Sequence, residues 1–457
     1  MLIELDTLLG ETESVCPECL ARVPAVRVAR GPDVYLRKAC PTHGRFETIL
    51  WRGRPAYSEW GRAAAPVFPT QPATPVQRGC PFDCGLCADH RQQSCCVLLE
   101  VTQRCDLHCP VCFADAGGAG TRDLPLPEIE ARLRGLWRAA GPVNLQLSGG
   151  EPGVRDDLPE IAALARGLGF RFIQVNTNGL RLARDPDFAA RLAAAGVATI
   201  FLQFDGTDDA VFTRLRGRPL LAHKLAAIER CGAAGLGVVL VPTVVPGVNA
   251  HQLGEIVRLA QAKQPTVRGV HFQPVSYFGR YPQAPRDADR ITLPEVMQAL
   301  EAQTGGQVAV EHFQPGGAEH ALCSFSANYV TMPDGSLHPL VRPRASGCCA
   351  PAAAEPGVAR ARDFVARSWA AAPTPATPST GPALGEWDIF LERARTHTLC
   401  LSGMAFQDAW TLDLERLRQC HIHVTQPDGV CIPFCAYNLT DRHGHALYRA
   451  AEPAVAA

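Results

Sequence analysis

Three cysteines at short, uneven intervals constrain this chain more than any other feature of its sequence. Cys105, Cys109 and Cys112 form a C-x3-C-x2-C run shortly after the apolar segment Val97–Val101. A tight loop after a strand can aim three thiolates at three irons of a cubane iron–sulfur cluster, which leaves the fourth iron without a protein ligand. We therefore expect an open cluster at which a cofactor or a substrate binds.

A structural zinc knuckle uses similar cysteine spacings, so the surrounding sequence is needed to distinguish an open iron–sulfur cluster from a zinc site. The segment Asn144–Pro152 runs from an apolar stretch into Gly149, Gly150 and Glu151. Glycines let a backbone approach a ligand closely, and a carboxylate accepts hydrogen bonds from an amino group. Together the two motifs resemble the signature of the radical S-adenosylmethionine (SAM) superfamily, in which the GGE residues contact the methionine part of SAM.

Length and charge favour an enzyme of several parts. The chain has 457 residues, more than one core usually fills, so two or three domains are expected. The formal net charge is -1 and no long uncharged apolar stretch is present, so we expect neither a nucleic-acid partner nor stable membrane insertion. The start Met1–Asp6 lacks the features of an export signal, which predicts a cytoplasmic protein. The 19 cysteines gather in short clusters, which there favours metal or cluster ligation over disulfides.

Residues 1–62 are expected to form a metal-binding ribbon, because two cysteine turns flank a short β-like segment. A tetrahedral site made of Cys16, Cys19, Cys40 and His43 would suit zinc(II). A fourth thiolate in place of His43 would suit a rubredoxin-like iron instead. The sequence leaves open whether His43 is a ligand or a solvated turn residue.

Residues 63–95 combine a Pro- and Ala-rich linker with a second C-x3-C-x2-C run. This run consists of Cys80, Cys84 and Cys87, and either Cys95 or Cys96 is expected to supply a fourth thiolate, with Cys95 as our choice. A cubane whose four irons all have protein ligands cannot bind SAM at an open iron. The set is therefore predicted to hold an auxiliary cluster for electron transfer or structure.

Residues 96–304 alternate β-like and helix-like segments, which predicts an α/β fold with a parallel sheet and right-handed crossovers. The six expected strands are Val97–Val101, Val143–Leu147, Phe170–Val175, Thr199–Phe204, Gly237–Val241 and Gly269–Gln273. The expected helices include Pro127–Ala140, Leu158–Leu168, Asp187–Ala195, Leu220–Ala234 and Ala250–Ala262. Six such units match the partial (β/α)6 TIM-type barrel of radical SAM enzymes.

Polar residues at the carboxyl ends of these strands are candidate site residues, because chemistry in such barrels gathers at that rim. They are Asn178, Gln203, Asp205, Thr243 and Gln273. Each of them alone is equally well explained as a loop residue that caps a turn. We expect Glu151 and Asn178 to contact SAM, and we name Glu151 and Asp205 as the catalytic residues.

Residues 305–457 lose the alternation and regain cysteines, which predicts a C-terminal auxiliary-cluster domain. Its expected ligands are Cys323, Cys400, Cys420 and Cys435, since the segments around Cys400 and Cys435 are apolar and would keep a cluster dry. Buried cysteines also pack as small hydrophobic residues, so inert thiols are the alternative.

The arrangement as a whole resembles one group within the superfamily. The run Arg78–Cys87, followed closely by Glu100–Thr102 and the Cys105 triad, is similar to the class D radical SAM methyltransferases, whose named member dimethylates 7,8-dihydro-6-hydroxymethylpterin. This resemblance implies a [4Fe-4S] cluster that binds SAM, one or two auxiliary [4Fe-4S] clusters, and SAM cleavage to a 5'-deoxyadenosyl radical. It also implies a carbon unit from a methylene-tetrahydropterin and a flavodoxin, ferredoxin or reductase as electron donor.

Other reactions fit parts of the sequence. Tetraether lipid synthase shares the architecture, which implies C–C coupling of alkyl chains as the alternative. A lipid enzyme needs an apolar tunnel and a membrane-facing patch, and no basic amphipathic helix is evident, so methyl transfer to a pterin-like molecule is preferred. A peptide-modifying enzyme would carry a dense cysteine run, of which only Cys431 and Cys435 form a fragment. A non-catalytic iron–sulfur electron carrier would not need six βα units.

Overall fold

The computed structural model describes five stretches of the chain, namely residues 6–61, 66–117, 123–340, 354–373 and 385–449. Part of the linker predicted in residues 63–95 lies outside them, at residues 63–65. Within the described stretches, no helix has the length and apolar character needed to cross a bilayer.

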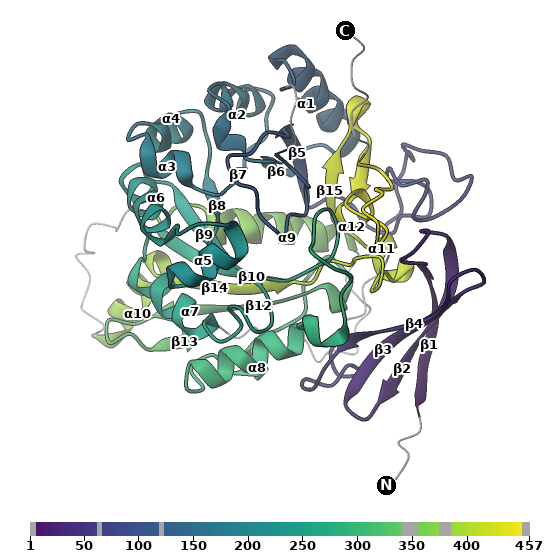
Figure 1. The fold of residues 1–457 in the computed structure, drawn as a ribbon. Coiled ribbons are helices and arrows are strands. Elements are labelled where there is room, and N and C mark those ends of the chain that lie inside the picture. The colour runs from purple at the N-terminus through teal and green to yellow at the C-terminus, as the bar shows by residue number, and fades with distance from the viewer. Residues whose placement is uncertain (1–5, 62–65, 118–122, 341–353, 374–384, 450–457) are drawn as a thin grey trace.

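The N-terminal part folds as an antiparallel ribbon whose strands follow chain order (Figure 1). The strands are β1 (Thr7–Val15), β2 (Arg22–Arg30), β3 (Asp33–Cys40) and β4 (Gly44–Trp51). Along β3, Val34 and Leu36 are buried and alternate with more exposed residues, as expected for a strand with one face on a core. The predicted ribbon is confirmed.

The middle of the chain forms a parallel sheet in the order β5-β6-β7-β8-β9-β11. These strands are β5 (Cys96–Thr102), β6 (Asn144–Gly149), β7 (Ile173–Thr177), β8 (Thr199–Gln203), β9 (Gly237–Val241) and β11 (Val267–Pro274). Each of them overlaps one of the six predicted strands. Continuous apolar runs such as Gly237–Val241, which is buried throughout, form such strands because both faces of a parallel sheet are covered.

The C-terminal part extends this sheet at both edges. Strand β14 (Thr398–Met404) lies parallel to β11, and β15 (Ile422–Thr425) lies parallel to β5. The remaining strands are β12 (Ser324–Thr331) and β13 (Leu337–Pro339) beyond β14, β16 (Cys431–Pro433) beyond β15, and the short β10 (Thr243–Val244) on β11. The sheet therefore continues past the expected domain boundary at residue 304. An open six-stranded sheet leaves two unpaired edges, and strands from the C-terminal part pair with both.

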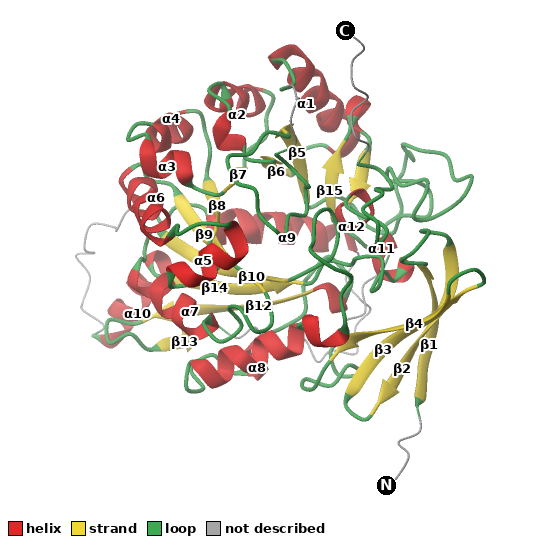
Figure 2. Cartoon of the chain, viewed as in Figure 1, coloured by secondary structure: helices red, strands yellow, loops and turns green. Residues whose placement is uncertain are grey.

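Helices cover the outside of the curved sheet (Figures 1 and 2). The helices of residues 96–304 are α1 (Leu126–Ala140), α2 (Leu158–Gly167), α3 (Leu180–Arg184), α4 (Phe188–Ala194), α5 (Asp209–Arg216), α6 (Leu221–Ala233), α7 (Leu253–Ala262) and α8 (Leu293–Gln303). The C-terminal part adds α9 (Ala354–Trp369), α10 (Glu386–Thr396), α11 (Leu414–Arg418) and α12 (Phe434–Tyr437). Helix α1 buries Ile129, Leu133 and Leu136, whose spacing matches one helical face.

Helix α9 lies across the N-terminal ends of the sheet strands. Arg362 donates to the carbonyl of Ser94 just before β5, and its own carbonyl accepts from Asn144 at the start of β6. At the other end of α9, the Trp369 carbonyl accepts from the hydroxyl of Thr199, the first residue of β8. Helix α9 therefore closes the interior of the sheet at the end opposite to the strands' carboxyl ends.

Buried polar contacts join the ribbon to the C-terminal part. Arg27 on β2 pairs with Asp413 at 2.7 Å and with Glu415, and the Asp413 side chain is fully buried. Lys38 on β3 donates to the carbonyl of Ala409 at 2.6 Å. The ribbon is thereby fixed to the segment that enters α11.

Removing Arg27 is expected to leave the buried charge of Asp413 without its partner. We predict that Arg27→Ala lowers the free energy of unfolding by about 3 kcal/mol, measured by urea denaturation, because an unpaired buried charge costs several times more than a lost surface contact. The matched control is Arg30→Ala on the same strand, whose pairs with Asp6 and Glu47 are solvent-exposed and contribute little. Equal stability of the two variants would contradict the prediction.

Candidate active site

A cavity of about 370 Å³ lies inside the curve of the sheet. Along β6 the side chains of Asn144, Gln146 and Ser148 line this cavity, whereas Leu145 and Leu147 belong to the hydrophobic core on the other face. Side chains alternate across a strand, so one apolar face can pack against helices while the polar face lines a binding site. The rim residues Gln203, Thr243 and Gln273 also line the cavity.

The loop after β5 brings Cys105, Cys109 and Cys112 to the cavity wall. Arg280 holds this loop in place, because its backbone exchanges two hydrogen bonds of 2.9 Å with the backbone of Cys112. Its guanidinium Nε also donates to the carbonyl of Cys109 at 3.0 Å. The triad thus faces a space large enough for a ligand, which fits an open cluster better than a closed zinc knuckle.

The glycine pair after β6 packs directly on the start of the cysteine loop. The amide of Gly150 donates to the carbonyl of Thr102, and the amide of Glu151 donates to the carbonyl of Arg104, both at 2.8 Å. A Cβ at Gly149 would overlap the carbonyl of Thr102, and a Cβ at Gly150 would overlap that of Arg104. The close approach that requires glycine is therefore made to the cysteine loop.

Glu151 joins the ends of β6 and β7. Its Oε1 accepts from the Thr177 hydroxyl at 2.6 Å and from the Gly153 amide at 2.8 Å, and its Oε2 accepts from the Asn178 amide at 2.6 Å. Burial raises the pKa of Glu151 to about 7, against the lowering effect of these hydrogen bonds. The carboxylate lines the cavity beside the cysteine triad, as expected for a ligand-binding group.

Asn178 also lies at the cavity wall. Its Nδ2 donates to Asp106 Oδ1 at 2.7 Å, and its Oδ1 accepts from the Leu180 amide at 2.9 Å. Because Asp106 lies between the first two cysteines of the triad, Asn178 connects the cysteine loop to the end of β7. The predicted site residues Glu151 and Asn178 thus lie together.

Asp205 does not line the cavity, contrary to the expectation of a catalytic residue. Its carboxylate is fully buried and binds Arg216 through two hydrogen bonds of 2.7 Å. It also accepts from the Thr243 amide at 3.1 Å. Arg216 lies between Asp205 and the cavity and lines it, so Asp205 acts as a positioning residue for that guanidinium.

Two cations near the site were not predicted from the sequence. Arg216 is one of many arginines, and no motif distinguishes it. Lys224 on α6 is fully buried and donates to the carbonyl of Asn178 at 2.5 Å and to Gln203 Oε1 at 3.1 Å. Because lysine occurs only three times in this arginine-rich chain, its rarity was the available signal.

The second C-x3-C-x2-C run converges as predicted, but without Cys95. Cys80, Cys84 and Cys87 lie around one small pocket next to α11, where contact with Cys80 and burial raise the pKa of Cys84. Cys95 packs against Ala318 and lines the main cavity instead. Its backbone is fixed there by the start of β15, since the Cys95 amide donates to the carbonyl of His421.

The C-terminal cysteines separate into three that gather and one that does not. Burial raises the pKa of Cys420 and of Cys435. The charges of Cys435 and Cys323 raise the pKa of Cys420 further, and the charge of Cys323 raises that of Cys435. Arg416 donates to Cys323 Sγ at 3.5 Å. Cys400 lies on β14 in a different apolar cluster with Phe201 and Trp369 and lines the main cavity. The predicted four-cysteine set is thus corrected to three.

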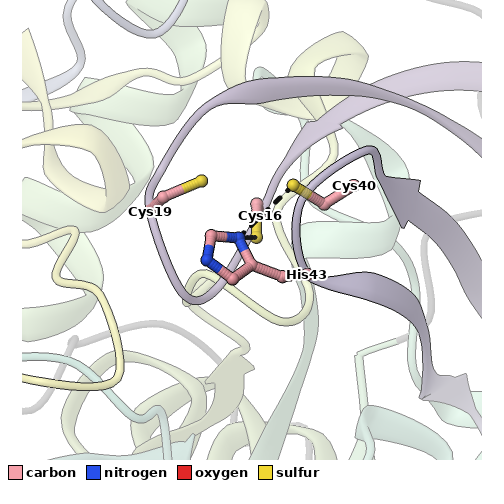
Figure 3. A group of neighbouring side chains, drawn as sticks. All are labelled: Cys16, Cys19, Cys40 and His43. Atoms are coloured by element: carbon pink, nitrogen blue, oxygen red, sulfur yellow. Dashed lines mark hydrogen bonds between the residues drawn. The ribbon is translucent and has the colours of Figure 1, made fainter.

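The ribbon cysteines form a compact group with a histidine. The ligand atoms of Cys16, Cys19, Cys40 and His43 all lie within 4.8 Å of one another. Figure 3 shows these side chains facing one another, with His43 Nδ1 lying 3.5 Å from the sulfurs of Cys16 and Cys40. Three sulfurs and one ring nitrogen around a point make a donor set for a tetrahedral metal ion.

Comparisons with known families agree with both sites. A model described as the radical SAM superfamily matches residues 99–260, which include the cysteine triad and the GGE motif. A model described as the HMPTM N-terminal zinc ribbon domain matches residues 8–52, which include the four ribbon residues.

Individual relatives cover more of the chain. It is 33% identical over 475 residues to 7,8-dihydro-6-hydroxymethylpterin dimethyltransferase of Methanocaldococcus jannaschii, a match that covers 94% of each chain. It is also 33% identical over 214 residues to GTP 3',8-cyclase of Erythrobacter litoralis, covering 45% of this chain and 61% of the relative. A solved structure of Streptococcus suis SuiB bound to SAM aligns with 47% of this chain and 48% of its own, at 16% identity and a TM-score of 0.38.

Replacing Gly150 by alanine is expected to force the GGE segment away from the cysteine loop. We predict that Gly150→Ala lowers the free energy of unfolding by about 2 kcal/mol, because backbone atoms have to move to admit the Cβ. Iron loading at the triad should fall as well, measured by iron counting after reconstitution. The control is Gly167→Ala at the end of α2, where a Cβ meets nothing within 4 Å. Normal iron loading and stability of Gly150→Ala would contradict this account of the glycine.

Proposed function

Because this chain belongs to the family of 7,8-dihydro-6-hydroxymethylpterin dimethyltransferase within the radical SAM superfamily, we propose that it methylates an unactivated carbon of a pterin-like molecule. The similarity extends over 94% of both chains, so it is not limited to the part that carries the superfamily motifs. The observation that carries the proposal is the placement of the cysteine triad, the GGE segment and a ligand-sized cavity together.

The triad residues Cys105, Cys109 and Cys112 would hold a [4Fe-4S] cluster with an open iron. When bound, this cluster supplies an electron to SAM, whose cleavage gives methionine and a 5'-deoxyadenosyl radical. In the cytoplasm, a flavodoxin, a ferredoxin or a reductase would deliver that electron. The carbon unit would come from a methylene-tetrahydropterin, with SAM as the radical source.

The protein's own residues orient SAM and keep water from the reaction. Glu151 presents a carboxylate suited to the amino group of SAM, and Arg216 presents a guanidinium suited to an anionic group. Asn178 donates hydrogen bonds to Glu151 and to Asp106 of the cysteine loop, so the carboxylate and the loop keep their relative positions in the SAM site. Helix α9 closes the far end of the cavity, which protects a reactive intermediate from solvent.

We further propose that two other cysteine sets hold auxiliary [4Fe-4S] clusters. One consists of Cys80, Cys84 and Cys87, and the other of Cys323, Cys420 and Cys435. The proximity of the buried thiols supports both sets: Cys84 shares a hydrogen bond with Cys80, and Cys420 lies close enough to Cys435 and Cys323 for their charges to raise its pKa. Arg416 beside Cys323 adds a positive charge that favours a thiolate cluster in the second set.

The reaction is tested with anaerobically reconstituted enzyme, dithionite and SAM, with and without a dihydropterin and methylene-tetrahydrofolate. We expect 5'-deoxyadenosine and a methylated pterin, both detected by chromatography and mass spectrometry. Formation of 5'-deoxyadenosine with an unchanged pterin would reject the substrate while leaving the radical chemistry intact. Absence of 5'-deoxyadenosine from fully loaded enzyme would reject the proposed reaction altogether.

Two cysteine variants separate the roles of the triads. We predict that Cys109→Ala removes one cluster and all cleavage of SAM, whereas Cys84→Ala removes a different cluster and leaves SAM binding intact. The measurements are iron content, the electron paramagnetic resonance spectrum with and without SAM, and yield of 5'-deoxyadenosine. Loss of SAM binding in Cys84→Ala with the main cluster loaded would mean that the two triads have the opposite roles.

The ribbon is proposed to bind one zinc ion through Cys16, Cys19, Cys40 and His43. We predict that Cys40→Ala loses one equivalent of zinc, measured by elemental analysis, and lowers the melting temperature, because a structural zinc contributes directly to folding. Iron in place of zinc in the wild-type ribbon would contradict the choice of metal. Full cleavage of SAM by the variant is expected, since the ribbon residues do not line the main cavity.

A further inference from the structure

A second carboxylate faces the main cavity besides that of Glu151. Among the described residues that line the cavity, the acidic side chains are Glu151 and Glu319. Glu319 lies in the segment before β12, and its side chain is 8% exposed. Glu319 belongs to no recognisable sequence motif, and the SAM-binding motifs do not include it. Burying a charge costs free energy, so a buried acidic side chain on a cavity wall indicates compensating contacts or a ligand.

Contacts with neighbouring residues hold the Glu319 carboxylate in place at the cavity wall. Its Oε1 accepts from the Ser324 hydroxyl, and its Oε2 accepts from the Ala318 amide at 3.3 Å and lies 3.2 Å from His421 Nδ1. Burial opposes the charge, but the His421 imidazole and the Ser324 hydroxyl hold the pKa of Glu319 below its ordinary value. An ionised carboxylate has about four acceptor sites, so these contacts leave capacity for further donors.

Aromatic surfaces and unpaired polar atoms line the same cavity. The His271 ring packs on Phe201 and on Trp369, with centroid distances of 5.5 Å and 5.8 Å. The charge of Glu319 acts on His271 by raising its pKa, against the larger lowering effect of burial. Gln174 Oε1 is buried and has no hydrogen-bond partner among the described residues, and the indole of Trp369 has only the weakly accepting thiol of Cys400 as a partner. Buried polar atoms without partners cost free energy, so a flat ligand with its own donors and acceptors would stabilise them.

We propose that Glu319 binds the 2-amino-4-oxopyrimidine edge of a pterin ring, an inference that rests on the proposed function. This edge carries two adjacent donors, the ring N3–H and the exocyclic amino group, which match the two oxygens of one carboxylate. Such charge-assisted pairs are stronger than neutral hydrogen bonds and are specific in direction. The aromatic group of Phe201, His271 and Trp369 provides apolar wall for the ring faces.

The same edge occurs on the dihydropterin that would be methylated and on the tetrahydropterin that would donate carbon. Glu319 is therefore assigned to a pterin ring, and binding experiments decide which of the two it holds. Reconstituted enzyme with SAM is titrated separately with 7,8-dihydro-6-hydroxymethylpterin and with a tetrahydropterin by calorimetry. The ring whose affinity depends on Glu319 is the one bound at this position, and either result supports the proposal.

The variant Glu319→Gln keeps the shape of the side chain and removes its charge. We expect the dissociation constant of the pterin that binds there to rise about 10- to 100-fold, since a site built for a donor pair loses its main acceptor. A pterin analogue with a 2-oxo group in place of the amino group should bind weakly to wild type. The variant should lose most of this preference for the amino compound. A purely structural role of Glu319 would not change this preference.

Several controls keep the outcome decisive. Glu311→Gln makes the same charge change at an exposed position earlier in the chain and should leave pterin affinity unchanged. Iron content and SAM cleavage without pterin report whether Glu319→Gln is folded and loaded. If it is not, Glu319→Asp takes its place, with a smaller loss of affinity expected. Wild type that binds no pterin would reject the proposed function, whereas wild type that binds pterin with a variant of unchanged preference would reject only the role of Glu319.

Discussion

The contact between the backbone of Gly149–Gly150 and that of Thr102–Arg104 is the constraint on which the site depends. It joins the carboxyl ends of two adjacent parallel strands, β5 and β6, through hydrogen bonds of 2.8 Å. The cysteine loop follows one of these strands, and Glu151 follows the other. Because side chains would separate the two backbones, glycine at both positions fixes the distance between the cysteine loop and the carboxylate that faces the cavity. Glu151 also accepts a hydrogen bond from the hydroxyl of Thr177, which connects this segment to β7.

The open edges of the sheet determine the role of the C-terminal part. The parallel sheet from β5 to β11 does not close on itself, and unpaired strand edges are unfavourable. Strands β14 and β15 cover the two edges and at the same time bring Cys400 and His421 to the cavity. Helix α9 closes the remaining end. The C-terminal part therefore completes the cavity wall with residues that lie far from the superfamily motifs in sequence.

Local patterns predicted the structure well, and long-range placement was not predictable. The strands and main helices of residues 96–304 follow from apolar periodicity, and the two C-x3-C-x2-C runs converge because short loops leave little freedom. The assignments of Cys95 and Cys400 failed, because Cys95 directly precedes β5 and Cys400 lies within β14, and the backbone partners that place both residues are distant in sequence. Asp205 was named for its position at the rim, but an adjacent arginine covers it. Glu319 lies in a segment without periodic pattern, so only the folded chain places it at the cavity.

The pKa values of the two carboxylates that line the cavity, Glu151 and Glu319, are shifted in opposite directions. Burial raises the pKa of Glu151 to about 7, so much of its population is neutral near neutral pH until a cation arrives. The pKa of Glu319 is lowered instead, because His421 and Ser324 compensate its burial. A ligand with an ammonium group would therefore bind at Glu151 with release of a proton, and its affinity would rise as pH increases towards 7. A neutral donor pair, such as the edge of a pterin, requires a carboxylate that is already ionised. The different electrostatic surroundings of the two carboxylates therefore support the proposed pairing of a charged ligand with Glu151 and of a neutral heterocycle with Glu319.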